Sequence, residues 1–138
     1  MKESVKVELL SDLAFEVHVN GHKLYIDSAP EHGGKNTGPQ PKPFMMVALA
    51  GCTAMDVASI LNKMREKVEE FSVEVEGEMA EEHPKKFIGM KVIYKIKGKD
   101  ISRKNVEKAV NLSNTRYCGV TANYQKAFPI EHEIMIEE

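Results

Sequence analysis

A long apolar stretch at residues 41–65 constrains the fold of this chain more than any other feature. Pro41 and Pro43 favour a helix start, because the first helical turn does not use those backbone N–H groups and the proline ring fixes φ. From Phe44 to Leu61, Asp56 is the only strongly polar residue. The sequence therefore predicts a helix over residues 43–67, about 37 Å long. A helix that is apolar on nearly all sides is buried.

Burial in a membrane and burial in a protein core are the two ways to cover such a helix. Gly51, Thr53 and Ser59 dilute the apolar run, and other segments alternate as the strands of a soluble protein do. The first residues, 1–4, lead into alternating polar and apolar positions rather than into the apolar run of a signal peptide. We therefore expect a buried core helix in a cytoplasmic protein without a membrane partner.

The size and charge of the chain narrow the possibilities further. The 138 residues fit one domain over residues 1–138. A chain of this size has few residues with which to bury the whole surface of such a helix, so we expect a partner chain to bury the rest. The net charge of −2 and the interspersed Lys and Glu leave no basic patch, which argues against nucleic acid as a partner.

Alternating patterns predict most of the remaining structure. Three N-terminal strands are expected, with a hairpin turn at Asn20-Gly21 because both positions tolerate positive φ. Ser102 is a good N-cap for a second helix. The predicted strands are 4–10, 15–19, 22–27, a hairpin of 71–76 with 88–97, and a closing strand 130–136; a glycine-rich and proline-rich loop covers 28–40, and the second helix covers 103–113.

Two cysteines are the chemically reactive residues of the sequence. Cys52 lies in the middle of the long predicted helix, and Cys118 lies on a break between the second helix and a short segment of small residues. They form no Cys-x-x-Cys pair, and a structural zinc site would bring more Cys or His at short spacing. From composition alone, isolated cysteines in a reducing cytosol are ordinary buried hydrophobes.

The motifs around these cysteines resemble those of the OsmC/Ohr family of thiol peroxidases, and in particular its OsmC-like branch. The resemblance covers nearly the whole chain. It implies an α+β OsmC-like fold in which antiparallel sheets pack around a long central helix, and an intertwined homodimer with each active site at the dimer interface. The motifs that carry it are Gly38-Pro39-x-Pro41, the run Ala48-Leu49-Ala50-Gly51-Cys52-Thr53-Ala54-Met55-Asp56-Val57, and Ser113-x-x-Arg116-Tyr117-Cys118-Gly119-Val120.

The same resemblance implies a peroxidase of the oxidative stress response whose catalytic residues are Cys52 and Cys118. Cys52 would attack an organic hydroperoxide and become a sulfenic acid, Cys118 would resolve it as a disulfide, and a dithiol reductant would restore both thiols. The thiolate is the nucleophilic form of cysteine, and a second thiol protects the sulfenic acid from further oxidation. No metal and no other cofactor is expected. Residues 44–47 are candidates to line an apolar substrate pocket, although ordinary core packing is the favoured explanation for them.

The sequence departs from the family at the groups that activate the thiol. Burial raises the pKa of a thiol, and a helix dipole fades within its first turn, so Cys52 needs a nearby cation. The family implies an Arg from the N-terminal sheet held by a Glu in a Pro-Glu motif. Here the first arginine is Arg65, and the motif position has Lys42 between two prolines. Lys42 lies about 15 Å along the helix axis from Cys52.

Several other residues are candidates for this environment. Arg116 is close in sequence to Cys118, and His18 and His22 lie on the N-terminal hairpin. Asp56 is one turn after Cys52, where a carboxylate raises the pKa of a thiol rather than lowering it. We therefore expect Asp56 to cap, or to pair with, a backbone or basic group across the dimer interface, and we do not assign it to catalysis.

Two alternatives to the peroxidase follow from these departures. The first is a non-catalytic ligand-binding or redox-sensing dimer that keeps the fold and the thiols. The second is a metal site made by Cys52, Cys118 and a histidine, which added zinc would stabilise.

Overall fold

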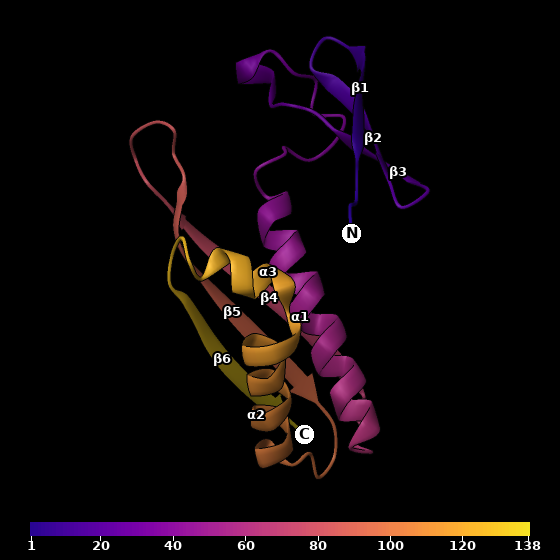
Figure 1. The fold of residues 1–138 in the computed structure, drawn as a ribbon, viewed down its shortest axis with the longest axis vertical. Helices are drawn as coiled ribbons and strands as arrows, with labels where there is room; N and C mark the ends of the chain where they lie inside the picture. Colours follow the sequence, from indigo (N-terminus) through magenta and orange to yellow (C-terminus); the bar gives the residue numbers. More distant parts are fainter. The chain divides into compact units, whose positions relative to one another are not determined.

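A computed structural model describes residues 1–138 and divides them into two compact units, Met1–Met45 and Met46–Glu138. The boundary falls in the first turn of the long helix. Figure 1 follows the elements along the chain. The expectation of a single domain over residues 1–138 stays a prediction.

The N-terminal unit contains the predicted three-stranded meander. Strands β1 (Lys6–Ser11), β2 (Ala14–Val19) and β3 (His22–Ile26) pair antiparallel in the order β1-β2-β3. Asn20 and Gly21 connect β2 to β3 with φ values of 49° and 78°. Because two consecutive positive φ values define the tight turn that fits a twisted hairpin, the predicted turn is confirmed.

The two faces of this sheet differ in chemistry. Apolar rows cross one face, Val7 with Val17 and Leu24, and Leu9 with Phe15 and Ile26. The alternation was predicted, but the expected burial is not reached in the single chain, where β1 is exposed at every residue. Leu9 keeps 60% of its surface exposed and Val7 keeps 47%. The only buried residue of the unit is Asp27.

The loop after β3 is organised by that buried carboxylate. Asp27 accepts hydrogen bonds from the N–H of Ser28 at 2.7 Å, the N–H of Lys35 at 3.3 Å, and the N–H and hydroxyl of Thr37 at 3.0 and 2.6 Å. The short 3-10 helix η1 (Pro30–His32) lies inside this loop. Gly34 is required by close packing, since a Cβ there would lie 2.0 Å from the carbonyl oxygen of Ser28.

The C-terminal unit holds a second sheet and all the long helices. Its sheet order is β4-β5-β6, with β4 and β5 antiparallel as predicted and β6 parallel to β5. Parallel neighbours need a crossover, and the helical segment between β5 and β6 provides it, which corrects the expectation of wholly antiparallel sheets. The elements are α1 (Phe44–Lys63), β4 (Glu70–Met79), β5 (Phe87–Lys97), α2 (Arg103–Leu112), η2 (Ser113–Tyr117), α3 (Gly119–Tyr124) and β6 (Ile130–Glu137).

Helix α1 is shorter than the sequence predicted. It ends at Lys63 rather than at residue 67. Arg65 adopts a φ of 62°, and a left-handed residue cannot continue a right-handed helix. The second predicted helix is confirmed as α2, with the hydroxyl of Ser102 accepting the N–H of Asn105 at 3.2 Å.

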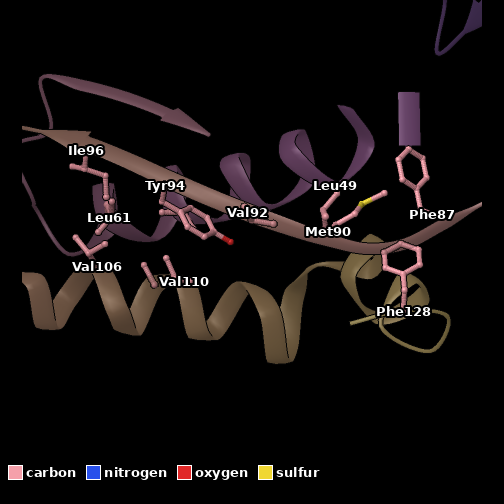
Figure 2. Close-up of a cluster of buried hydrophobic side chains, with 12 residues drawn as sticks. Leu49, Leu61, Phe87, Met90, Val92, Tyr94, Ile96, Val106, Val110 and Phe128 are labelled. Atoms are coloured by element: carbon pink, nitrogen blue, oxygen red, sulfur yellow. The ribbon is translucent and has the colours of Figure 1, made fainter. Parts of the chain in front are cut away.

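The core of this unit lies between its sheet and the helices α1 and α2. Figure 2 shows side chains of α1, β5 and α2 meeting there, with Tyr94 and Val92 from the middle of β5. Both residues are fully buried. This core fixes α1 and the segment after α2 on the same sheet, and these two elements carry the cysteines.

Helix α1 buries one line of side chains in the single chain. The buried residues are Leu49, Thr53, Val57 and Leu61, at successive intervals of one turn. Met55 is 77% exposed, so the predicted burial on all sides is not reached within one chain. By length and composition α1 is also apolar enough to cross a membrane. One such helix is weak evidence for a membrane span, because core helices pass the same test.

Candidate functional site

Helix α1 places Cys52 and Asp56 on one face. Residues four apart in an α-helix are neighbours on its surface. Between them in the sequence, Thr53 is fully buried and bonds back to the carbonyl of Leu49 at 3.1 Å, so it faces the core. Cys52 and Asp56 are both only partly exposed. The site therefore begins with a thiol and a carboxylate side by side.

Cys118 reaches the same place from the segment after α2. Helix α2 continues directly into η2, a π-helical turn, and Cys118 follows as the N-cap of α3. The N–H of Cys118 donates to the carbonyl of Ser113 at 2.8 Å, and its Sγ accepts the N–H of Thr121 at 3.3 Å. Single π-turns often occur at functional sites. The break in helicity that the sequence predicted at Cys118 is confirmed.

The two cysteines and Asp56 form one cluster. The Sγ atoms of Cys52 and Cys118 and a carboxylate oxygen of Asp56 all lie within 4.8 Å of one another. Both cysteines are free thiols, Cys118 is 3% exposed and Cys52 is more accessible. Residues far apart in sequence are thus brought into contact. The catalytic roles assigned to Cys52 and Cys118 from the sequence remain predictions.

The surroundings of Cys52 favour its neutral form. Burial raises the pKa of its thiol, as do the hydrogen bond with Cys118, the charge of Cys118 and the charge of Asp56. The N–H of Val120 opposes these effects by donating to Cys52. The prediction of a raised thiol pKa is confirmed. No sequence pattern indicated that backbone N–H groups of α3 face both sulfurs.

Asp56 has a partner that the sequence did not suggest. The hydroxyl of Ser113 donates to Oδ2 of Asp56 at 3.0 Å. Ser113 thereby connects α1 to the π-helical turn that carries Cys118. The expected pairing of Asp56 with a backbone or basic group across the dimer interface stays a prediction.

The cationic candidates from the sequence have other contacts. Arg116 is exposed, and its guanidinium lies 5.5 Å from the centre of the Tyr117 ring. In the N-terminal unit, Nε2 of His18 lies 2.8 Å from a carboxylate oxygen of Glu16. His22 and Lys42 are both exposed. Within the C-terminal unit the charged side chain next to Cys52 is Asp56, which is an anion.

A second polar cluster joins the sheet to the π-helical turn η2 through His132 of β6. Nδ1 of His132 lies 3.2 Å from the hydroxyl of Tyr94 and 3.2 Å from Nδ2 of Asn114. Burial is the largest influence on Tyr94 and raises its pKa to about 12. The phenol is therefore neutral at physiological pH. The alternating pattern of β5 assigned Tyr94 to the buried face correctly but gave no sign of this polar contact.

A cavity continues along α1 from Asp56. Its volume is about 420 Å³, and Lys63 and Lys108 border it. Its other lining residues are Ser59, Ile60, Met64, Leu112 and Tyr117. Of the residues predicted to line an apolar pocket, Met46 packs against the hydrophobic core and Val47 is 61% exposed. Core packing therefore accounts for Met46.

Comparison with known proteins identifies relatives of this chain in both sequence and fold. The family model of the OsmC-like protein matches residues 33–133. The chain is 34% identical over 113 residues to protein YhfA of Escherichia coli K12, covering 82% of this chain and 81% of that protein. A hypothetical protein from Aquifex aeolicus VF5 has a TM-score of 0.87 at 26% identity, covering 100% of this chain and 98% of its own.

A third structure shares the fold at lower identity. An organic hydroperoxide resistance protein OsmC from Legionella pneumophila has a TM-score of 0.71 at 15% identity, covering 98% of this chain and 97% of its own. The mixed α+β architecture with two small sheets agrees with these structures. The match to the family model and the identity to YhfA establish that the chain belongs to the OsmC-like protein family.

Proposed function

We propose that the protein is a cytoplasmic thiol peroxidase that reduces organic hydroperoxides. The Cys52 thiolate attacks one peroxide oxygen, so an S–O bond forms, the O–O bond breaks, and the alcohol leaves after taking a proton. Cys118 then attacks the Cys52 sulfenic acid, which forms the disulfide and releases water. A dithiol reductant exchanges with this disulfide and restores both thiols.

The closeness of the two thiols is the observation that carries this proposal. The Sγ atoms of Cys52 and Cys118 lie within 4.8 Å of each other. A disulfide requires these two sulfur atoms to close to about 2.05 Å. Membership of the OsmC-like family supports a redox role linked to peroxides. A fold neighbour from Legionella pneumophila is described as an organic hydroperoxide resistance protein.

Backbone N–H groups supply part of the stabilisation that a thiolate needs. The N–H of Val120 donates to Cys52, and the N–H of Thr121 donates to Sγ of Cys118 at 3.3 Å. Hydrogen bonds to the charged form of a group favour that form. We infer that these donors take over part of the task of the absent arginine. The raised pKa of Cys52 predicts a slow reaction at neutral pH that accelerates as pH rises.

The proposal includes a homodimer in which a second copy covers the apolar sheet face of the N-terminal unit. That face carries Leu9, Val7 and Leu24, which are 60%, 47% and 43% exposed. The opposite face is polar, with Lys6 pairing with Glu8 at 2.6 Å. Exposed apolar surface of this kind marks an interaction site. In this dimer, residues 1–138 of each chain act as a single OsmC-like domain.

Peroxide consumption by the reduced protein tests the proposal. Cumene hydroperoxide and dihydrolipoamide are mixed with the wild type, with Cys52→Ser and with Cys118→Ser, in the presence of a chelator. We expect Cys52→Ser to lower kcat/KM by at least about a thousandfold, because it removes the nucleophile. Cys118→Ser is the matched control, since it should still form one sulfenic acid per chain that dimedone traps. Wild-type turnover no faster than that of Cys52→Ser would contradict the proposal.

A non-catalytic redox-sensing or ligand-binding dimer is the second candidate. The anionic neighbour of Cys52 and its raised thiol pKa favour it. Both candidates predict alkylation of Cys52 that accelerates about tenfold per pH unit below the thiol pKa, because the thiolate fraction grows by that factor. The sensor alone predicts that hydroperoxide oxidises the thiols once, without sustained turnover when dithiol is added.

A further inference from the structure

We propose that Cys52, Cys118 and Asp56 together form a zinc site. Two sulfur atoms and one carboxylate oxygen lie within 4.8 Å of one another. Zinc prefers thiolate, imidazole and carboxylate ligands in a tetrahedral arrangement. The sequence suggested a histidine as the third ligand, whereas in the structure the third candidate ligand is Asp56. The three donors leave a fourth position for water or another ligand.

The geometry requires only small movements. Zn–S bonds of about 2.3 Å and Zn–O bonds of about 2.1 Å place the sulfur and oxygen donors of a tetrahedral site about 3.6 to 3.8 Å apart. Each donor pair therefore closes by no more than about 1.2 Å from the 4.8 Å limit. Cys52 and Asp56 are one turn apart on the rigid helix α1, and Cys118 approaches from the N-cap of α3. The ligands thus come from two elements held by the same core.

Neighbouring groups already orient two of the three ligands. Ser113 donates to Oδ2 of Asp56 at 3.0 Å, which leaves Oδ1 available for the metal. The N–H of Thr121 donates to Sγ of Cys118 at 3.3 Å. Partners of this kind fix metal ligands in place, and their loss lowers metal affinity about 10-fold to 100-fold. The charged side chain beside the thiols is an anion, which disfavours a thiolate nucleophile and favours a bound cation.

Zinc binding and thiol oxidation exclude each other at this site. Binding replaces one proton on each thiol with the metal, so Zn²⁺ enters and the thiol protons leave to solvent. The Cys52–Cys118 disulfide has no thiolate to offer, and its formation releases the metal. Zinc therefore holds both thiols in the reduced form. Inhibition of turnover by zinc rests on the proposed peroxidase function, whereas the binding itself does not.

Metal titration of the full-length reduced chain tests this site. The protein is reduced with a phosphine, which is removed before Co²⁺ or Zn²⁺ is added. We expect one metal per chain, release of about two protons per metal, and a thiolate-to-cobalt charge-transfer band with tetrahedral cobalt absorption. Asp56→Asn should weaken zinc binding about 100-fold and Ser113→Ala about 10-fold. Glu81→Gln, on an exposed loop, is the control and should leave affinity unchanged.

Three results would overturn the zinc site: no charge-transfer band, equal zinc affinity in Asp56→Asn and wild type, or equal affinity in the disulfide form. The disulfide form needs no substitution, so it provides the comparison if Asp56→Asn does not fold. These readouts do not involve turnover. A protein that binds zinc as described but shows no peroxide turnover with chelator would therefore refute the proposed function and leave the zinc site standing.

Discussion

The two units of this chain are built on opposite physical principles. The C-terminal unit has a continuous hydrophobic core in which Leu49, Val92 and Tyr94 are fully buried. The N-terminal unit buries only Asp27, a carboxylate. Its loop is stabilised by hydrogen bonds to that carboxylate, and the apolar face of its sheet stays exposed. The C-terminal unit therefore has a hydrophobic core within a single chain, although Met55 of α1 stays exposed, whereas the N-terminal unit leaves one whole apolar sheet face exposed.

The candidate catalytic site and the candidate dimer surface therefore lie in different units. The cysteine cluster lies on α1 and the turn before α3, and both elements rest on the finished core. Preorganised sites belong on such rigid elements. The exposed sheet of the N-terminal unit is free to serve in assembly. Core substitutions should therefore affect stability at any protein concentration, whereas substitutions on the N-terminal sheet should act through the proposed dimer.

The same leucine-to-alanine change in each unit gives the largest expected contrast. Leu49→Ala removes a fully buried side chain and should lower the free energy of unfolding by about 2 to 5 kcal/mol. Leu9→Ala, at a position 60% exposed, should change it by less than about 0.5 kcal/mol in the monomer. Urea unfolding at protein concentrations above and below the dissociation constant of the proposed dimer measures the change in unfolding free energy for both variants. A large cost of Leu9→Ala at the lowest concentration would show that the N-terminal unit has a core of its own.

A charge on the apolar sheet face tests the assembly directly. Leu9→Lys should weaken the proposed dimer at least about 100-fold, a change of about 2.7 kcal/mol, because it places an ammonium group in an apolar interface. Light scattering during size-exclusion chromatography measures the mass. Tyr25→Lys is the matched control, since Tyr25 is 48% exposed on the polar face and lies beside Glu16. Equal masses for both variants and the wild type would rule out this face as the interface.

Much of the fold was predictable because local patterns determine it. The alternation of polar and apolar residues predicted the strands, Asn20-Gly21 predicted the hairpin turn, and Ser102 predicted the start of α2. The end of α1 was missed because the left-handed φ of Arg65 depends on where the chain must turn, and arginine has no special preference for it. The parallel pairing of β6 was missed because alternation gives a strand its faces but not its direction.

The site was predictable only in part for a related reason. Motifs identified Cys52 and Cys118, and burial predicted the direction of the Cys52 pKa. The partnership of Asp56 with Ser113 joins residues from α1 and the turn after α2, which no local pattern connects. The carboxylate cluster at Asp27 was missed likewise, since its donors lie up to ten residues along a loop that was assigned only from its glycines and prolines.

Acid titration of Asp27 tests how the N-terminal unit is stabilised. Hydrogen bonds from Thr37 are the largest influence and, with those from Ser28 and Lys35, lower the pKa of Asp27 from 3.8 to about 2. A depressed pKa stabilises the folded loop above about pH 3.8, and this contribution is lost as pH falls through about 2. Asp27→Asn should remove the pH dependence in this window and accelerate amide exchange at Thr37 about 10-fold at neutral pH.

Asp12→Asn provides the control for this titration in the same unit. Asp12 is exposed and lies 3.1 Å from the ammonium group of Lys35, and surface pairs of this kind contribute little. Its substitution should leave the acid window and the exchange at Thr37 unchanged, as followed by amide exchange between pH 2 and 6. If Asp27→Asn behaved like Asp12→Asn, the buried carboxylate would not hold the loop. The exposed sheet would then depend on dimer contacts alone, and its exchange rates should vary with protein concentration.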